Sequence, residues 1–361
     1  MVRPLRFEIA AVRARIGEVI SMDAWAEWAR IPHRSAPDAV LRGSEVHSIL
    51  GIASKSWSPS VFRDPQVVID LMRDTIAGAG LEPGDIDAAV IVTCTPFEVM
   101  LDQDAFRLLR GAGVPDHVVP MVHMAGCAGL ARAMATVSRL DAKRVLIVAY
   151  TAVSPLMCSP DGEPNPIYLG NGGHPRSSIL WASPATFSDG AAAMVLTRCE
   201  ASAGACFYTR DALDPAVTSG LVEFPGGGAL HPPGFAGSTE QSAFGLVSQD
   251  VVRYYVEGMR LNHERLLALE PDYVDQVRRI YTHQASPGLV ERFRALAVLP
   301  PEKVPTHAAR LGNLVTPSTM KLLADDLEAG VVGPGDRICV SVVGAGPERG
   351  AFIGRIAETV G

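Results

Sequence analysis

The sequence predicts an α/β fold made of two similar halves, in which short buried strands alternate with helices. Three observations support this prediction. The chain has 361 residues, of which 48% are hydrophobic and 20% charged, enough to bury a large core. Segments such as AAVIVT and RVLIVAY are apolar throughout, which is typical of strands buried on both faces of a sheet. Strand and helix patterns then recur in the same order in the second half.

In the first half, apolar residues recur at helical spacing over 66–80, which predicts a helix. A buried strand is expected at 88–93. A second helix is expected over 126–140, followed by strands at 144–150 and 191–196.

In the second half, the same reasoning predicts strands at 279–283, 337–343 and 351–356. Helices are expected over 287–298 and 316–329. The order therefore repeats that of the first half.

The two halves can be laid on each other at an offset of about 190 residues, which places Cys94 over His283. We interpret this as an internal duplication with a pseudo-two-fold relation. The predicted halves are 1–198 and 199–361. Two turn-rich stretches interrupt the pattern, one at 154–183 and one at 224–237, and a loop as long as the first is usually functional or an insertion.

Composition excludes several classes of function. The net charge is −7 and no run of Lys or Arg occurs, which disfavours nucleic-acid binding. No apolar run is long enough to span a bilayer, and charges interrupt the N-terminal segment where a signal peptide is apolar. None of the six cysteines forms a C-x-x-C pair, so neither a metal site nor a disulfide framework is expected. A cytoplasmic protein without membrane contact is the expectation.

Cys127 is the candidate nucleophile. It lies in HMAGCAGLARAM, between an expected strand and a helix, and small residues surround it. A cysteine at the first turn of a helix experiences the positive end of the helix dipole, which favours the thiolate. Taken alone, this pattern is also that of a buried structural cysteine.

His283 and Asn313 are the candidate partners of Cys127 in a reaction. His283 ends an expected strand and Asn313 precedes an expected helix, positions at which α/β folds carry site residues. The thiolate would accept an acyl group, and the imidazole and amide would stabilise negative charge or move a proton. Thiol proteases also use Cys, His and Asn, so the set alone does not determine the reaction.

The motifs together resemble those of the ketoacyl-ACP synthase III branch of the thiolase-fold condensing enzymes. The similarity covers nearly the whole chain, in order. The segments that carry it are GCAG at 126–129, SDGAAAMVL at 188–196, FPGGGALHPP at 224–233, HQAS at 283–286, LGN at 311–313 and VVGAGPERGA at 342–351. The resemblance implies a thiolase-like duplicated five-layered α/β/α/β/α sandwich.

The resemblance also implies a reaction and its residues. An acyl thioester would transfer its acyl group to Cys127, and a malonyl-type thioester would then lose CO₂. His283 and Asn313 would stabilise the enolate, which attacks the acyl-enzyme in a Claisen condensation. The backbone N–H groups of Cys127 and Ala345 would form the oxyanion hole. The thioesters would be carried by coenzyme A or acyl carrier protein, and no metal or organic cofactor is expected.

Departures from the family pattern point to altered substrates. The family's R-T-G-I-x-x-R element, tied to coenzyme A binding, is SILGIASK at 48–55, so its first arginine is absent and its second is lysine. HQAN ends here in Ser286, and GNTS continues as Leu314 and Val315. We interpret these changes, together with the long loop at 158–183, as typical of specialised metabolism rather than housekeeping fatty-acid synthesis.

The family also pairs as homodimers, which complete each pocket from the neighbouring subunit. The segment TPFEVMLD at 95–102 is where that contribution is expected, from Phe97 or Met100. The expected substrate pocket thus contains Phe97, Met100, Ser286 and Leu314.

Two alternatives stay open. The chain could transfer the acyl group from Cys127 to a hydroxyl or amine, with His283 as general base. It could also be a catalytically idle partner subunit of a larger assembly, in which case Cys127 would carry no acyl adduct.

Overall fold

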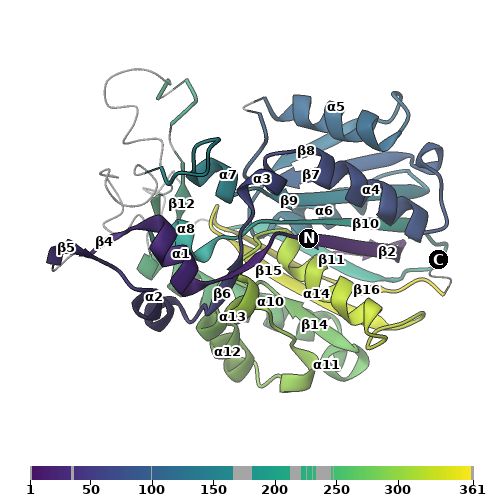
Figure 1. The fold of residues 1–361 in the computed structure, drawn as a ribbon. Helices are drawn as coiled ribbons and strands as arrows, with labels where there is room; N and C mark the ends of the chain where they lie inside the picture. The colour runs from purple at the N-terminus through teal and green to yellow at the C-terminus, as the bar shows by residue number, and fades with distance from the viewer. Residues whose placement is uncertain are drawn as a thin grey trace.

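The structure is a computed structural model, and two five-stranded sheets stacked between helices form its body (Figure 1). It describes residues 2–33, 36–98, 100–165, 181–211, 221–224, 226–229, 231–232, 245–246 and 248–358.

The N-terminal sheet has the strand order β2-β10-β9-β7-β8. Its strands are β2 (Phe7–Ile16), β10 (Gly190–Arg198), β9 (Arg144–Thr151), β7 (Ala88–Thr93) and β8 (Pro120–Met124). The strand β7 runs parallel to both neighbours, whereas β10 runs antiparallel to both of its own. The residues of β7 are all buried, as expected for a strand with helices on both faces.

The C-terminal sheet has the order β1-β11-β16-β15-β14. Its strands are β1 (Val2–Leu5), β11 (Gly204–Arg210), β16 (Glu348–Arg355), β15 (Arg337–Gly344) and β14 (Arg279–Thr282). The pairs β14–β15, β15–β16 and β16–β11 repeat the parallel and antiparallel sense of β7–β9, β9–β10 and β10–β2. This repetition confirms the predicted duplicated α/β fold.

Helices complete five layers (Figure 1). In the middle, α6 (Gly129–Val137) and α14 (Pro317–Glu328) share one core with both sheets. A second core lies between the N-terminal sheet and two outer helices, α4 (Gln66–Gly78) and α5 (Leu101–Ala112). A third lies under α10 (Ser248–Leu269) and α12 (Pro287–Leu296) on the other side.

Smaller elements gather at one end of the layers, around a fourth apolar cluster that contains Trp25 and Trp57. The remaining elements are β3 (Val19–Ser21), α1 (Met22–Ala29), β4 (Pro32–His33), β5 (Ala36–Val40), α2 (Gly43–Leu50), β6 (Ser54–Ser56), α3 (Pro59–Phe62), α7 (Ser154–Met157), α8 (Ala182–Thr186), β12 (Val222–Glu223), β13 (Gly245–Leu246), α11 (Tyr273–Gln276), α13 (Ala308–Leu311) and the 3₁₀ turns Pro83–Asp85 and Pro301–Lys303.

The observed elements differ from the predictions in three ways. The helix expected from 126 begins at Gly129, so Cys127 precedes it. Two helices, α5 and α10, were not predicted. The predicted division between 198 and 199 falls between β10 and β11, but β1 from the first half pairs in the C-terminal sheet. Half of the turn-rich stretches at 154–183 and 224–237 lies outside the described residues.

Candidate active site

Cys127 lies between the end of β8 and the start of α6. Its turn is tied to β7 by a hydrogen bond from the Ala125 N–H to the Thr93 carbonyl, 2.9 Å long. The Thr316 hydroxyl, at the start of α14, donates to the Gly126 carbonyl at 2.5 Å. Gly129 has no room for a side chain, because a Cβ there would lie 2.5 Å from Val92. The duplicated helices α6 and α14 therefore hold the turn from both sides.

His283 follows β14 and is buried, with 4% of its surface exposed. Its backbone N–H donates to the Ser341 carbonyl of β15 at 3.0 Å. The Tyr255 hydroxyl of α10 donates to the His283 carbonyl at 2.8 Å, and the two rings lie 5.8 Å apart. These contacts hold the backbone of His283 and leave its Nδ1 without a partner among the described residues.

Asn313 is held by its neighbours on both sides. Its N–H donates to the Thr186 carbonyl, and its own carbonyl accepts from the Ser188 N–H, both at 2.9 Å. Its side-chain Oδ1 accepts from the Val315 N–H at 2.8 Å, which leaves the amide nitrogen to donate elsewhere. The Asn313 side chain also hydrogen-bonds the sulfur of Cys127, an interaction that lowers the pKa of the thiol.

One pocket of about 370 Å³ contains all three side chains, so the structure brings Cys127, His283 and Asn313 together. None of the described residues that line it is Lys, Arg, Asp or Glu. Its walls are mostly apolar and come from α2, the 181–187 segment, α10 and the start of α12. The apolar and aromatic residues among them include Ile49, Leu50, Trp181, Phe187, Leu221, Val251, Val252, Tyr254, Tyr255 and Leu289.

The other predicted site residues divide into two groups. Ala345 and Ser286 line the pocket, and the Ser286 hydroxyl also caps α12 by accepting from the Leu289 N–H. Three others lie outside the pocket of this chain. Leu314 is fully buried beneath it, Phe97 stacks on Tyr150 at 4.9 Å in the outer core, and Met100 is 64% exposed.

The surroundings of Cys127 do not favour the thiolate, contrary to the prediction from its turn. Burial raises the pKa of the thiol, and this effect exceeds the lowering by the hydrogen bonds from Asn313 and from the backbone of Cys127 itself. The resting nucleophile is therefore a thiol, and a base must accept its proton when an acyl group arrives.

Burial also lowers the pKa of His283 to about 3, with a smaller contribution from the charge on nearby His307. The imidazole is therefore neutral at physiological pH. A neutral imidazole both accepts and donates a hydrogen bond, so His283 is able to serve a thiol or a developing oxyanion.

An ion pair not predicted from the sequence ties the Cys127 helix to the turn at Ala345. Arg132 of α6 binds Glu348, which begins β16 and is buried. The Tyr208 hydroxyl donates to the same carboxylate at 2.5 Å. A Cβ on Gly344 would lie 2.9 Å from Ala128, so the turn already packs closely on the start of α6. These contacts join the start of α6, next to Cys127, to the turn that contains Ala345.

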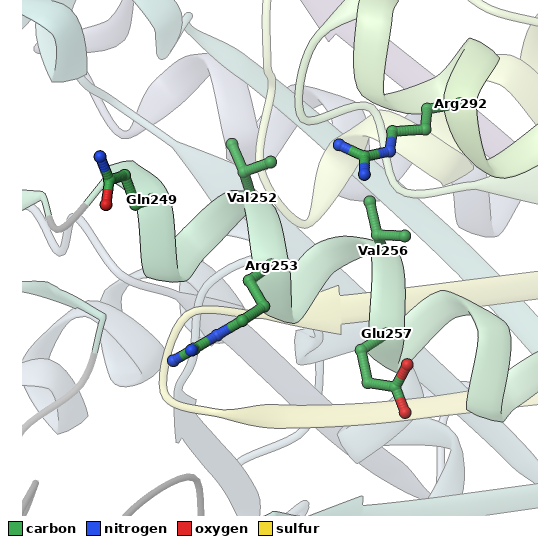
Figure 2. A pocket seen from close by; sticks show the side chains of 6 residues that line it. All are labelled: Gln249, Val252, Arg253, Val256, Glu257 and Arg292. Atoms are coloured by element: carbon green, nitrogen blue, oxygen red, sulfur yellow. The ribbon is translucent and has the colours of Figure 1, made fainter.

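A second hollow lies on the outer face of α10, and Val252 lines both it and the catalytic pocket. Figure 2 shows five of its side chains along α10 and one on α12: Gln249, Val252, Arg253, Val256, Glu257 and Arg292. The hollow thus holds the cations of Arg253 and Arg292 beside the carboxylate of Glu257, and Arg253 is paired with Asp250 at 2.9 Å.

Within the part of the chain that the structure describes, no three His, Cys, Asp or Glu side chains are arranged to hold a metal ion. No helix among those residues has the length and apolar character needed to cross a membrane. The expectations of no cofactor and of a cytoplasmic location stay predictions.

Comparison with known proteins agrees with this architecture. Residues 273–356 match the family model of the 3-oxoacyl-[acyl-carrier-protein] synthase III C terminal. The chain is 26% identical over 341 residues to a β-ketoacyl-[acyl-carrier-protein] synthase III of Nitratidesulfovibrio vulgaris strain DP4, covering 88% of this chain and 95% of that protein. It is 27% identical over 313 residues to the synthase III of Paracoccus denitrificans, covering 84% and 87%.

Solved structures show the same fold. A 3-oxoacyl-(acyl-carrier-protein) synthase III superposes with a TM-score of 0.77 at 17% identity, covering 97% of this chain and all of the other. A priming β-ketosynthase from a polyketide pathway superposes with a TM-score of 0.73 at 18% identity, covering 98% and 97%. The chain therefore shares the fold of the ketoacyl-ACP synthase III enzymes and is similar to them over nearly its whole length.

Proposed function

We propose that this protein forms a carbon–carbon bond by decarboxylative Claisen condensation on an acyl group carried by Cys127. The observation that carries the proposal is one pocket lined by the Cys127 thiol, the His283 imidazole, the Asn313 amide and the turn at Ala345. Cys, His and Asn have the chemistry for acyl transfer followed by enolate stabilisation.

In the first step, the sulfur of Cys127 attacks the carbonyl carbon of an acyl thioester. Neutral His283 accepts the thiol proton, and the N–H groups of Cys127 and Ala345 stabilise the oxyanion. The thioester C–S bond then breaks, the donor leaves as a thiol after taking that proton, and an acyl-Cys127 thioester remains.

In the second step, a malonyl-type thioester occupies the emptied part of the pocket. Its C–C bond to the carboxylate breaks, CO₂ leaves, and the electron pair forms an enolate whose oxygen accepts from His283 and Asn313. The enolate carbon attacks the acyl carbonyl, and Cys127 departs as a thiolate that takes up a proton. Because the described residues that line the pocket include no Lys, Arg, Asp or Glu, the carboxylate is poorly solvated by them, which favours its loss as CO₂.

The donor is an acyl group on acyl carrier protein or coenzyme A, as the names of the synthase III relatives suggest for the carrier. Ile49 stands where the family pattern has its first arginine, and it lies 63% exposed at the pocket mouth. This position therefore offers no cation to a coenzyme A phosphate. Arg253 and Arg292 of the outer hollow offer positive charge to the phosphate of either carrier (Figure 2).

A homodimer formed through β8 belongs to the same proposal. The strand β8 is the last of its sheet, and exposed apolar side chains lie on and near it. They are Met100, Phe106, Val119 and Met124. In such a dimer, Met100 would be available to the pocket of the partner. Analytical ultracentrifugation of the wild type tests this part.

The decisive experiment follows the protein through both steps. Intact-protein mass spectrometry after incubation with a panel of acyl thioesters is expected to show one acyl adduct, and Cys127→Ala is expected to show none. Adding a malonyl thioester should release CO₂ and a β-keto product. An adduct that yields an ester or amide without CO₂ would support acyl transfer to a hydroxyl or amine, and the absence of any adduct would support an idle subunit.

The low pKa of His283 predicts how the second step depends on pH. Because the folded-state pKa of about 3 lies below the ordinary 6.5, the neutral form persists as pH falls, and CO₂ release from preformed acyl-enzyme should stay constant between about pH 7.5 and pH 5.5. Stopped-flow CO₂ assays measure this, with circular dichroism to verify folding. A decline centred near pH 6.5 would show that His283 titrates normally and would contradict the prediction.

A further inference from the structure

Lys55 of β6 is a fully buried lysine, with none of its surface exposed. Its ammonium donates to the backbone carbonyls of Ala185 at 3.2 Å and Phe187 at 2.7 Å, and also to that of Pro184. Three carbonyls match the three N–H donors of an ammonium group. Burying a charge is costly unless it is paired and hydrogen-bonded, so this arrangement calls for an explanation.

Two indole rings complete the surroundings of the charge. The Lys55 nitrogen lies 4.3 Å from the ring centre of Trp57 and 5.0 Å from that of Trp25. Burial lowers the pKa of Lys55 well below its ordinary value, and the negative charge of buried Asp189 offsets only part of this lowering. Lys55 is absent from the residues that line the catalytic pocket, so it does not act as the coenzyme A contact implied by its place in the 48–55 segment.

The segment 184–188 binds both Lys55 and Asn313 through its backbone groups. The carbonyls that accept from Lys55 lie in the last turn of α8 and just after it. Thr186 and Ser188, in the same segment, make the two backbone hydrogen bonds to Asn313. The same segment forms part of the pocket wall, through Trp181, Thr186 and Phe187.

The residues just before Lys55 also bind the segment that precedes Asn313 in the sequence. The Ala53 N–H donates to the Ala309 carbonyl at 2.8 Å, and the Ser54 hydroxyl donates to the Arg310 carbonyl at 2.7 Å. A Cβ on Gly312 would lie 3.5 Å from the Cβ of Lys55. Lys55 therefore lies where the two segments that flank Asn313 meet.

We propose that Lys55 is a positioning residue for Asn313, in that its ammonium holds the 184–187 backbone and thereby aims the Asn313 amide at the reacting centre. This inference rests on the proposed function. If Asn313 acts on the enolate, loss of Lys55 impairs release of CO₂ far more than it impairs acylation of Cys127, a pattern that general instability would not produce.

The test compares both rates in Lys55→Met, which keeps an unbranched side chain of similar length and removes the three N–H donors. We expect CO₂ release from preformed acyl-enzyme to fall about tenfold or more, and acylation to stay within about threefold of wild type. Lys55→Arg keeps a cation with N–H donors and should retain most of the CO₂ release. An unchanged rate of CO₂ release in Lys55→Met, or an equal loss in both steps, overturns the proposal.

A double-mutant cycle tests whether Lys55 acts through Asn313. In an Asn313→Ala background, Lys55→Met should cause no further loss of CO₂ release, whereas independent roles would give additive losses and contradict the proposal. If Lys55→Met does not fold, Lys55→Gln, which keeps two N–H donors, replaces it in the same cycle.

Hydrogen exchange separates this inference from the proposed function. Peptides that cover 184–190 and 309–316 should exchange faster in Lys55→Met than in wild type, because the hydrogen bonds between Asn313 and its neighbours open more often. Unchanged exchange there contradicts the role of Lys55, whatever the reaction. A wild-type protein that never releases CO₂, with faster exchange in the variant, contradicts the proposed function alone.

Discussion

Asn313→Ala is expected to retain acylation of Cys127 while losing release of CO₂. His283→Ala is expected to lose release of CO₂ and also to slow acylation, because His283 accepts the thiol proton in that step. Both side chains line the same pocket as the thiol, and each supplies an N–H donor to the enolate oxygen that forms when CO₂ departs. Removal of one such donor costs about 10² to 10³ in rate. The measurement is CO₂ release by acyl-enzyme prepared beforehand and quantified by mass spectrometry, so that the two steps are read separately.

The control for this prediction is Ser286→Ala, which alters a pocket residue whose hydroxyl caps α12 rather than serving the reaction. Its CO₂ release should stay within a few-fold of wild type. Equal losses of acylation and CO₂ release in Asn313→Ala would mean that the amide serves the first step as well. Undiminished CO₂ release in either variant would remove that residue from the proposed mechanism.

Gly312→Ala is expected to lower both the free energy of unfolding and the rate of the condensation step. Gly312 has φ 69° and ψ −161°, a conformation essentially restricted to glycine, and it immediately precedes Asn313. A Cβ there would lie 2.3 Å from the Ser188 hydroxyl oxygen and 3.1 Å from the Thr186 carbonyl. The free energy of unfolding should fall by about 1–3 kcal/mol or more. CO₂ release should fall at least about tenfold, since Asn313 would be displaced.

Gly330→Ala is the matched control, measured by the same denaturant titration. Gly330 also has a positive φ, 67°, but a Cβ there would meet nothing within 4 Å. Its unfolding free energy should fall by about 1 kcal/mol, from backbone strain alone, and its catalysis should not change. If Gly312→Ala and Gly330→Ala lose the same unfolding free energy and the same activity, the close contacts of a Cβ at position 312 do not cause the loss.

Much of the fold could be predicted because its strands and central helices have simple patterns. The apolar strand at 88–93 and the helix that follows 316 are found within a few residues of their predicted limits. The outer helices α4 and α12 are predicted, but α5 is not, although it carries the signal. Buried residues of α5 recur at Ala105, Leu108, Leu109 and Ala112, which is helical spacing.

The contents of the site were predictable only in part. Cys127 and His283 follow strands and precede helices, and Asn313 precedes α14, so their convergence at one end of the two sheets follows from topology. Their ionisation did not follow, because the cost of burying a thiolate depends on the walls of the pocket rather than on its own turn. The prediction for Leu314 failed for a similar reason. Its neighbour Asn313 lines the pocket, but Leu314 is buried outside it, because adjacency in sequence does not determine which way a side chain points.

The position of β16 within its sheet has a consequence for how the protein is made. It is the last strand described, yet it lies in the middle, between β11 and β15. During synthesis on the ribosome, β1 and β11 must therefore wait until residue 355 has emerged before that sheet can close. The N-terminal sheet is complete once β10 has emerged. A nascent chain stalled between these points would hold a folded first half beside unpaired strand edges that a chaperone would need to protect.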